Sequence, residues 1–373
     1  MKYKLKDIAE IIAGGTPSTK IEQYWNGEIA WITPKDLANH SGRYISRGER
    51  NITKEGLENS STKLMPINSV LFTSRAPIGY VAIAKNQVCT NQGFKSLVCK
   101  DSICYYMYIY YWLIYNTDYI KSKANGSTFQ EISTNVMKEI EIELPSIDYQ
   151  KKVANILEKI DEEIELNNQI NDNLYEIQKC YFKKLFKSNS KYEIVRLDEL
   201  CSISAGGDAP KEKSNIKSEK YNIPIISNSI DNDGIYGYTD KSKINAKSIT
   251  ISARGTIGFK VLRNYAYYPI VRLISLVPKT DMVSSEYIFY ILDDISINST
   301  GTTQQQLTVP MVKDLKIKIF NKELIEKFTM FSINLNNKIE NNKIENQNLE
   351  QLRNTLLPKL MNGEIDLNKI KIE

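Results

Sequence analysis

The chain has 373 residues and a formal net charge of +5; 42% of its residues are hydrophobic and 25% are charged. This length accommodates two domains of ordinary size with connecting helices, and the composition is typical of a soluble globular protein. A single histidine excludes metal sites built on histidine. Five scattered cysteines without a C-x-x-C pair fit reduced thiols in a cytoplasm rather than a disulfide framework or a zinc site.

Residues 1–145 predict an α+β domain. They contain short apolar or alternating runs, such as 70–72, 80–84 and 140–144, separated by Gly, Pro and Asn, which is typical of strands with a few helices. The most apolar run, 103–115, is shorter than the roughly 20 residues of a membrane span, so we predict a buried helix there. No signal peptide is predicted at the start of the chain, and we expect a cytoplasmic protein with no membrane partner.

Residues 146–190 predict a long helix. Pro and Gly are absent between residues 146 and 187, and apolar residues recur every three or four positions. A helix of about 40 residues is roughly 60 Å long at 1.5 Å per residue, which is longer than a compact domain needs.

The chain then repeats itself once. The matched segments are residues 5–8 and 197–200, 13–15 and 205–207, 74–80 and 253–259, 96–98 and 275–277, 108–109 and 287–288, and 126–128 and 301–303. The first copy carries extra residues between these segments, so the framework is shared while the inserts differ, as in two copies of one fold that present different loops. We therefore predict a second α+β domain in residues 191–320, followed by a second long helix and a C-terminal tail in 321–373.

Each predicted helix has an apolar seam that asparagine interrupts. The seam positions are Val153, Leu157, Ile160, Ile164, Asn167, Leu174 and Leu185 in the first helix, and Phe328, Leu335, Ile339, Asn342, Leu349, Leu356 and Leu360 in the second. An asparagine in a seam either fixes register and partner at a cost in stability or marks a wet, frayed middle, and the sequence leaves both open. Because both seams lie in one chain, we expect the helices to pair with each other as an antiparallel coiled coil rather than to form a homodimer.

Tandem copies joined by such helices predict a pseudo-twofold arrangement. DNA readers of this kind meet half-sites about one helical turn apart, roughly 34 Å or somewhat more. The helices would then act as a ruler whose length sets the spacing. Periodicity alone does not show DNA binding.

Several motifs resemble those of the specificity subunits of Type I restriction-modification enzymes. They are the stretch Y-W-N-G-E-I-A-W-I-T-P-K-D-L at residues 24–37, preceded by G-G-T-P-S at 14–18; the turn at 75–79; N-Q-G-F at 91–94; G-S-T-F-Q-E-I at 126–132; and L-P-S-I-D-Y-Q-K-K at 144–152. The resemblance covers essentially the whole chain, in the order domain, helix, domain, helix.

The resemblance implies two target-recognition domains that each read one half of a bipartite site on double-stranded DNA. It also implies that the helices dock methyltransferase subunits, which we expect to be two, and through them the restriction subunits. The chain itself would be a non-catalytic recognition subunit without cofactors, and S-adenosylmethionine, ATP and Mg would be bound by the partner subunits. A specificity subunit of a related combined restriction-methylation enzyme is the alternative within this class.

The second domain departs from the family pattern. Residues 224–228 stand in place of the W-x-T-P-x-D-L element, and residues 270–273 in place of N-Q-G-F. We therefore expect a different recognition subtype in the second domain.

The candidates for DNA contact are small, polar or basic residues in the predicted loops. They are Gly14, Gly15, Thr16, Lys35, Arg75, Asn91, Gln92, Thr128 and Gln130 in the first domain, and Gly206, Gly207, Lys211, Arg254, Thr303 and Gln305 in the second. Glycine N–H groups can approach phosphate closely, arginine can clamp phosphate or pair with guanine, threonine and the amide side chains suit phosphate or adenine edges, and lysine neutralises phosphate.

Each candidate also has a structural interpretation. The glycines can form ordinary turns, the arginines local salt bridges, and the other side chains solvated polar loops. For Trp25 and Trp31 we predict packing rather than base stacking, and for His40 a solvated loop.

Known catalytic signatures are missing from the sequence. It contains no Pro-Pro pair, which excludes the [N/D]-P-P-[Y/F] motif of N6-adenine methyltransferases, and no G-x-x-x-x-G-K-[S/T] loop. We therefore predict that the chain is not an enzyme. Two alternatives remain, a DNA-modifying enzyme with its own catalytic centre and a coiled-coil scaffold that binds no DNA; the scaffold predicts no salt-dependent DNA affinity.

Overall fold

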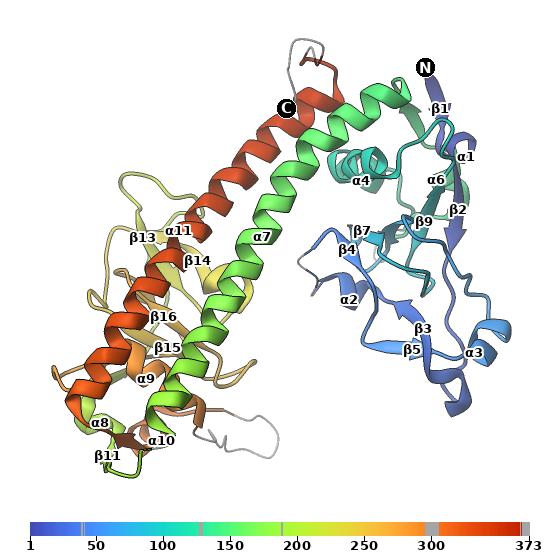
Figure 1. The fold of residues 1–373 in the computed structure, drawn as a ribbon. Helices are drawn as coiled ribbons and strands as arrows, with labels where there is room; N and C mark the ends of the chain where they lie inside the picture. The colour runs from blue at the N-terminus through green and yellow to red at the C-terminus, as the bar shows by residue number, and fades with distance from the viewer. Residues whose placement is uncertain are drawn as a thin grey trace. The chain divides into compact units, whose positions relative to one another are not determined.

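The computed structural model describes residues 1–38, 40, 42–126, 130–187, 189–294, 306–365 and 367. The chain divides into two compact units. The first comprises Met1–Asn168 and Ile344–Glu373, and the second comprises Gln169–Lys343. Each unit contains one α+β module and half of each of two long helices (Figure 1).

The first module is built on a five-stranded sheet. Its strand order is β2 (Ala9–Ala13), β9 (Lys95–Cys99), β6 (Val70–Ser74), β7 (Ile78–Ala84) and β4 (Tyr44–Ile45). Neighbouring strands are antiparallel except β4, which runs parallel to β7. Every residue of β6 is buried, as expected for a central strand with both faces covered.

A smaller sheet completes this module. Its centre is β3 (Trp25–Ile32), which is antiparallel to β5 (Arg50–Ile52) and parallel to β8 (Val88–Thr90). Trp25 and Trp31 are buried, and their rings meet edge to face with centroids 5.1 Å apart. The prediction that both tryptophans pack in the interior is therefore confirmed.

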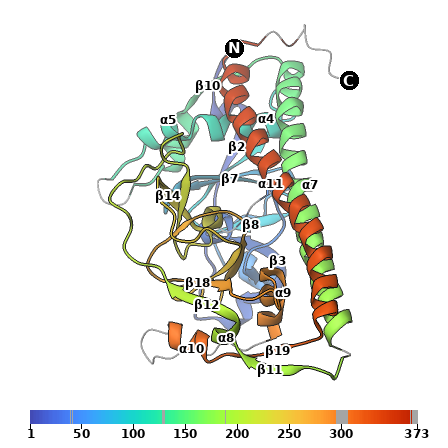
Figure 2. The same cartoon turned by 90° about the vertical axis from the view of Figure 1, so that its left-hand side faces the viewer.

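Short elements surround the two sheets. They are β1 (Lys2–Lys4), which pairs with β10 (Glu141–Glu143), and α1 (Leu5–Ile8), η1 (Glu22–Tyr24), α2 (Pro34–Ala38), α3 (Lys54–Glu58), α4 (Tyr106–Tyr115), α5 (Thr117–Ser122) and α6 (Thr134–Glu139). Helix α4 is largely buried, as predicted, and packs beside the first half of α7 (Ile147–Phe186) (Figures 1 and 2). Within the described residues, no helix is long and apolar enough to cross a membrane.

The second module repeats this arrangement. Its larger sheet has the order β12 (Cys201–Ala205), β18 (Leu273–Pro278), β15 (Ser248–Ser252) and β16 (Lys260–Arg263), which correspond to β2, β9, β6 and β7. All of its neighbouring strands are antiparallel, as are the corresponding four strands of the first module. The described part of this sheet has no counterpart of β4.

The smaller sheet is also repeated. Strand β13 (Ile223–Ile226) is antiparallel to β14 (Ile235–Thr239) and parallel to β17 (Tyr268–Pro269), and these are the directions found around β3. The segment that replaces the W-x-T-P-x-D-L element therefore still forms the central strand. The remaining elements are β11 (Glu193–Arg196), paired with β19 (Lys316–Ile319), α8 (Leu197–Leu200), η2 (Asp231–Gly234), α9 (Ser285–Ile291), η3 (Leu292–Asp294) and α10 (Val309–Lys313).

The two long helices are α7 and α11 (Lys322–Met361), each 40 residues long. Within each unit the two helix halves are antiparallel. Side-chain hydrogen bonds between them join residues of increasing number in α7 to residues of decreasing number in α11. Of the predicted seam residues, Val153, Leu157, Ile164, Asn167, Phe328, Ile339, Asn342 and Leu360 are buried, and Ile160, Leu174, Leu185, Leu335, Leu349 and Leu356 are half-buried. The predicted α+β fold with an antiparallel helix pair is confirmed.

Side-chain amides interrupt both halves of the helix pair. In the first unit Asn167 Nδ2 donates to Asn346 Oδ1 at 3.0 Å, and in the second unit Asn342 Nδ2 donates to Asn171 Oδ1 at 2.9 Å. These are equivalent pairs in the repeat, and all four side chains are buried. Because each amide finds its partner in one register only, the contacts favour a register-setting role over a frayed middle.

We predict that Asn346→Leu lowers the free energy of unfolding by about 2 kcal/mol, because it removes the buried acceptor of the Asn167 amide and leaves it only the longer contact with Glu345 Oε2 at 3.3 Å. The double variant Asn167→Leu/Asn346→Leu should recover most of this loss, since an apolar pair leaves neither amide of the pair unsatisfied. Chemical denaturation of the single and double variants measures the coupling. Additive losses in the two single variants would contradict a specific pair.

Candidate nucleic-acid interface

Several loops of the first unit meet at one edge of its module. Gly15 N donates to Thr90 O at 2.9 Å, Ser74 N donates to Gly93 O at 2.7 Å, and Ile132 N donates to Ser74 O at 3.0 Å. These backbone hydrogen bonds join the loops after β2, β6 and β8 to the segment that precedes α6. Most of the candidate residues of the first domain lie in these loops.

Arg75 lies at the centre of this loop cluster. Its Nη1 is 3.4 Å from Glu131 Oε2, and Lys95 Nζ is 3.4 Å from Glu131 Oε1. The side chain of Lys95 is 7% exposed, whereas those of Arg75 and Glu131 are each 39% exposed. An ion pair this exposed adds little stability, so a phosphate or base edge can replace Glu131 as the partner of Arg75 at small cost.

Polar side chains lie beside this arginine. Thr16 Oγ1 donates to Gln92 Oε1, and both residues are exposed. The Asn91 side chain turns inward, where Oδ1 accepts from Gly93 N at 2.9 Å. The cluster therefore presents Thr16, Gln92 and Arg75 to solvent, while Asn91 shapes the turn.

The second unit assembles the equivalent loops with the same two hydrogen bonds at the position of Ser74, and with a different bond at its glycine pair. Ala253 N donates to Arg272 O at 2.8 Å, and Leu307 N donates to Ala253 O at 2.9 Å, which repeat the two bonds of Ser74. Gly206 N donates to Leu273 O at 2.8 Å. The replacement of N-Q-G-F by residues 270–273 therefore changes the side chains and keeps the backbone arrangement.

Arg254 occupies the place of Arg75 but has a different partner. Its Nε and Nη2 donate to Gln306 Oε1 at 2.9 and 2.5 Å, and Gln306 corresponds to Glu131. An amide aligns the guanidinium without neutralising it. Arg272 is exposed, has φ of 71°, and borders the same cavity of about 460 Å³ as Arg254. A left-handed backbone is uncommon for a residue other than glycine and often marks a functional site.

The candidate glycines serve close packing. A Cβ at Gly14 would lie 2.0 Å from Asn91 O, and one at Gly206 would lie 2.0 Å from Ile270 O. The N–H groups of Gly15 and Gly206 already donate to neighbouring backbone. Backbone carbonyls thus already accept from these two N–H groups, and phosphate contact by the glycines stays a prediction.

The remaining candidates lie on the surface or outside the described residues. Lys35 is exposed and pairs with Glu49 at 2.7 Å, Lys211 and Gln130 are exposed, and Gly207 is half-buried. His40 lies in a loop but is half-buried rather than solvated. Thr128, Thr303 and Gln305 lie outside the described residues. In the part of the chain that the structure describes, no cluster of His, Cys, Asp or Glu is placed to hold a metal ion.

A buried ion-pair network that the sequence did not predict joins the first module to the helices. Arg43 is 5% exposed, and its Nε and Nη2 donate to the two carboxylate oxygens of Glu165 at 3.0 and 3.1 Å. Its Nη1 is 3.3 Å from Glu158 Oε1. Burial raises the pKa of the Glu165 carboxyl, but the hydrogen bonds and charge of Arg43 outweigh this effect, so its pKa lies below the ordinary value.

A second buried carboxylate extends this network. Asp161 accepts hydrogen bonds from Tyr111 Oη and Arg353 Nη1, both at 2.6 Å. It lies at a buried helix position next to the half-buried Ile160. The sequence signals this site only by an acidic residue next to an apolar seam position. It does not predict the partners, Tyr111 and Arg353, because they lie far from Asp161 in the chain.

Comparison with known proteins agrees with the repeated loop clusters. The model of the Type I restriction modification DNA specificity domain matches residues 1–176 and 189–353, which correspond to the two copies. The chain belongs to this family. The resemblance drawn from the sequence motifs is thereby confirmed.

Relatives within the family span nearly the whole chain. The type I restriction enzyme MjaIX specificity subunit of Methanocaldococcus jannaschii is 34% identical, over 98% of this chain and 94% of that protein. A putative type I specificity subunit of Mycoplasma pneumoniae, S.MpnORF507P, is 26% identical, over 85% of this chain and 84% of that protein. The crystal structure of a Type I restriction-modification system S subunit from M. genitalium has the same fold, with a TM-score of 0.59 at 18% identity over 96% of this chain and 95% of that one.

We predict that Glu165→Gln lowers the free energy of unfolding by about 3 kcal/mol at neutral pH, because it removes a carboxylate from the buried Arg43. The pKa of Glu165 is depressed in the folded state, so its contribution is present above the ordinary carboxyl pKa and is lost as the pH falls through the folded-state value. Denaturation of wild type and variant from pH 7 to pH 3 should show a shrinking difference. The exposed Glu163→Gln is the control, and a pH-independent difference would contradict the prediction.

Proposed function

We propose that this chain is the DNA-recognition subunit of a Type I restriction-modification enzyme, in which each module reads one half of a bipartite site. The observation that carries the proposal is the loop cluster that occurs twice. The same backbone hydrogen bonds place Arg75 in one module and Arg254 in the other. The residues beside the two arginines differ.

These differences supply the chemistry for reading two sequences. Glu131 is replaced by Gln306, Gly93 by Arg272, and Gln92 by Val271 at equivalent positions. Each replacement changes the donors, acceptors or apolar groups that a base edge would meet, while the shared backbone keeps the module's approach to phosphates unchanged. Two unlike half-sites are the expected result.

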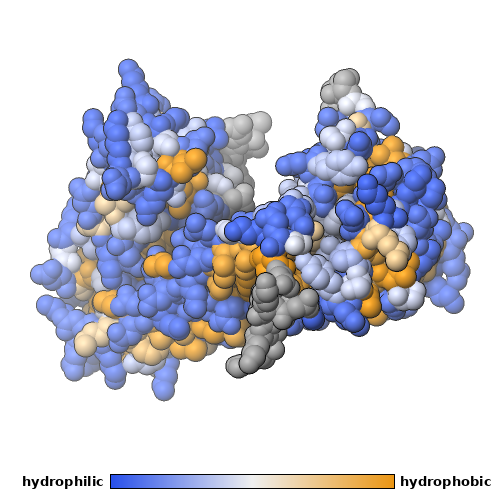
Figure 3. All heavy atoms as spheres, turned by 90° about the horizontal axis from the view of Figure 1, so that it is seen from above, coloured by the Kyte–Doolittle hydropathy of each residue, from blue (hydrophilic) through white to orange (hydrophobic). Residues whose placement is uncertain are grey.

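Partner subunits would supply the catalysis. We infer that methyltransferase subunits bind S-adenosylmethionine and that restriction subunits bind ATP and Mg, since this chain lacks the sequence signatures for those tasks. Ile177 of the second unit and Leu352 of the first are equivalent helix residues, 50% and 46% exposed. This repetition supports two equivalent docking surfaces and hence two methyltransferase subunits. The face shown in Figure 3 is mostly hydrophilic with separate hydrophobic patches, as expected for contacts of limited size.

The test is to express the chain with its partner subunits and to sequence N6-methyladenine. A bipartite methylated site is expected only when this chain is present. The purified complex should bind DNA with an affinity that falls steeply with salt. Methyl transfer or cleavage by this chain alone would indicate an enzyme with its own catalytic centre, and the absence of salt-dependent DNA binding would indicate a scaffold.

We predict that Gln306→Glu weakens recognition of one half-site by about two- to fivefold, because it gives Arg254 the weakly competing acidic partner that Arg75 has. The reciprocal variant Glu131→Gln should affect only the other half-site. Binding of the assembled complex to DNA with one half-site altered measures each effect, so the unaltered half-site is the internal control. Equal weakening at both half-sites, or none, would show that these positions do not face DNA.

We also predict that one whole heptad inserted after Asn167, together with one after Asn342, widens the gap between the half-sites. Both insertions lie next to the paired amides, and a whole heptad preserves the seam. Methylation mapping reads the gap directly, and a variant with a heptad inserted after Asn167 alone is the control for loss of pairing. An unchanged gap in an active complex would remove the helices as the determinant of spacing.

A further inference from the structure

Strand β4 of the first unit is a fifth strand with no counterpart among the described residues of the second. Ile83 N donates to Arg43 O at 2.8 Å, and Lys85 N donates to Ile45 O at 2.9 Å, so β4 lies along the edge of β7. Arg43, the residue directly before β4, extends from this edge to Glu165 and Glu158 on α7. The edge of the sheet and the helix are thus bridged by one short basic segment.

Within the residues that the structure describes, no strand covers the equivalent edge in the second unit. Strand β16 corresponds to β7, and it is an edge strand among the strands that the structure describes. Strands β15 and β16 pair in the same register as β6 and β7, so Leu262 and Asn264 occupy the positions of Ile83 and Lys85. The backbone N–H groups of Leu262 and Asn264 therefore point to the side where β4 would lie.

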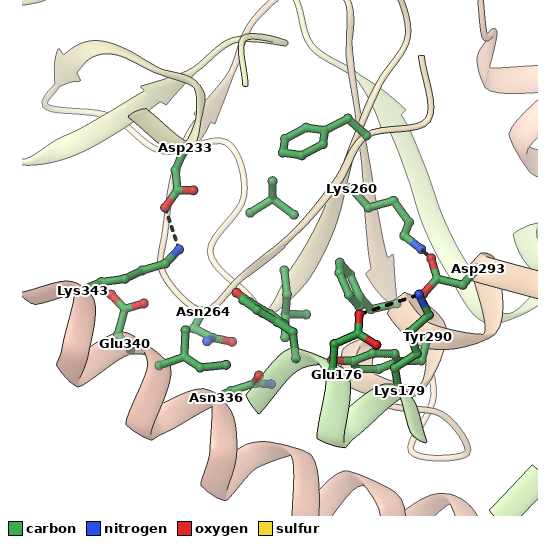
Figure 4. A pocket seen from close by; sticks show the side chains of 16 residues that line it. Glu176, Lys179, Asp233, Lys260, Asn264, Tyr290, Asp293, Asn336, Glu340 and Lys343 are labelled. Carbon is green, nitrogen blue, oxygen red and sulfur yellow. Dashed lines mark hydrogen bonds and ion pairs between the residues drawn. The ribbon is translucent and has the colours of Figure 1, made fainter. Parts of the chain in front are cut away.

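A cavity of about 360 Å³ borders this edge, between β16, α9 and the helices of the second unit (Figure 4). Three residues around Arg43 in the first unit have counterparts in its lining. Glu165, Asp161 and Tyr111 correspond to Glu340, Asn336 and Tyr290, respectively. The cavity is therefore the place that β4 and its arginine fill in the first unit.

Polar groups in this cavity lack partners within the described residues. Tyr290 Oη and Asn336 Nδ2 have no hydrogen bond, although these residues are only 5% and 9% exposed. In the first unit the equivalent tyrosine donates to the carboxylate of Asp161. Leaving buried polar atoms unpaired is costly, which favours a polar occupant.

The charges of the lining favour a cation. Its three lysines each have an acidic neighbour: Lys343 with Asp233 at 2.8 Å, Lys179 with Glu176 at 4.0 Å, and Lys260 with Asp293. Among the described residues, Glu340 is the carboxylate of this lining without an ion pair. Aromatic rings of Tyr175, Phe259 and Phe289 complete the walls, and such rings attract a guanidinium.

We propose that this cavity binds an extended, arginine-bearing segment of a partner protein, which adds a strand to the edge of β16 and places its guanidinium on Glu340. Strand addition to an open edge is a common mode of peptide recognition, and the guanidinium fork matches a carboxylate. A second copy of this chain is a poorer occupant, because its own segment 43–45 is already bound in its first unit. The proposal concerns a protein contact and does not rest on DNA reading.

The probe is the end-blocked hexapeptide Gly-Arg-Tyr-Ile-Ser-Arg, which is residues 42–47 of this chain, added at millimolar concentration to the full-length protein. Residue-resolved hydrogen exchange should show protection at the amides of Leu262 and Asn264. Glu340→Gln should weaken peptide binding about tenfold, since it removes a charge-assisted contact. The exposed Glu326→Gln on the same helix is the matched control. A peptide with citrulline in place of its first arginine should bind the wild-type protein weakly. Its affinity should equal that of the intact peptide for Glu340→Gln.

Three outcomes would overturn the proposal. They are no protection at Leu262 and Asn264, equal binding of the arginine and citrulline peptides, or equal binding to the wild type and Glu340→Gln. Self-association of the free chain that Glu340→Gln abolishes would assign the edge to a second copy instead. The bipartite methylation pattern tests DNA reading separately, so failure of the two proposals is distinguishable.

Discussion

The pairing of buried side-chain amides between α7 and α11 is the constraint on which each unit depends. Apolar seams allow two helices to slide by a turn at little cost, whereas Asn167 and Asn346 are satisfied together in one register only. Once that register is set, Asp161 meets Arg353, and Leu157 and Leu360 join one core. The module of each unit packs on a helix surface that this polar contact has already fixed.

In the duplicated modules, the backbone that holds the loops is shared, whereas the side chains proposed to read DNA differ. The backbone bonds made by Ser74 recur at Ala253, so both loop clusters have the same frame. The side chains of these loops are free to differ, because the shared hydrogen bonds involve only backbone groups. Glu131 and Gln306 show the consequence: a change of one functional group alters the charge offered beside an arginine and leaves the fold intact.

Local patterns predicted the repeat, the long helices, the buried helix at 103–115 and the packed tryptophans, because periodicity and composition record such features directly. Contacts between distant segments were not predictable. Arg43 lies in an insert without a counterpart, and its partner Glu165 is far away in the chain. The glycine pair Gly14 and Gly15 signals close approach without showing what approaches, and in the structure a Cβ at either position would meet neighbouring backbone. The contact residues on DNA remain predictions.

Each module is joined to the long helices of its own unit by an ion pair, and the module supplies the cation in one unit and the anion in the other. In the first unit the module supplies Arg43 and the helix supplies Glu158 and Glu165, whereas in the second unit the helix supplies Lys343 and the module Asp233. Buried charges are costly without their partners. Glu158 corresponds to Ile333 in α11, so a first module on the second helix face would lose one of its two carboxylates. A module and the helix face on which it packs therefore have complementary charges. A recognition module that is exchanged between chains has to be transferred together with that helix face.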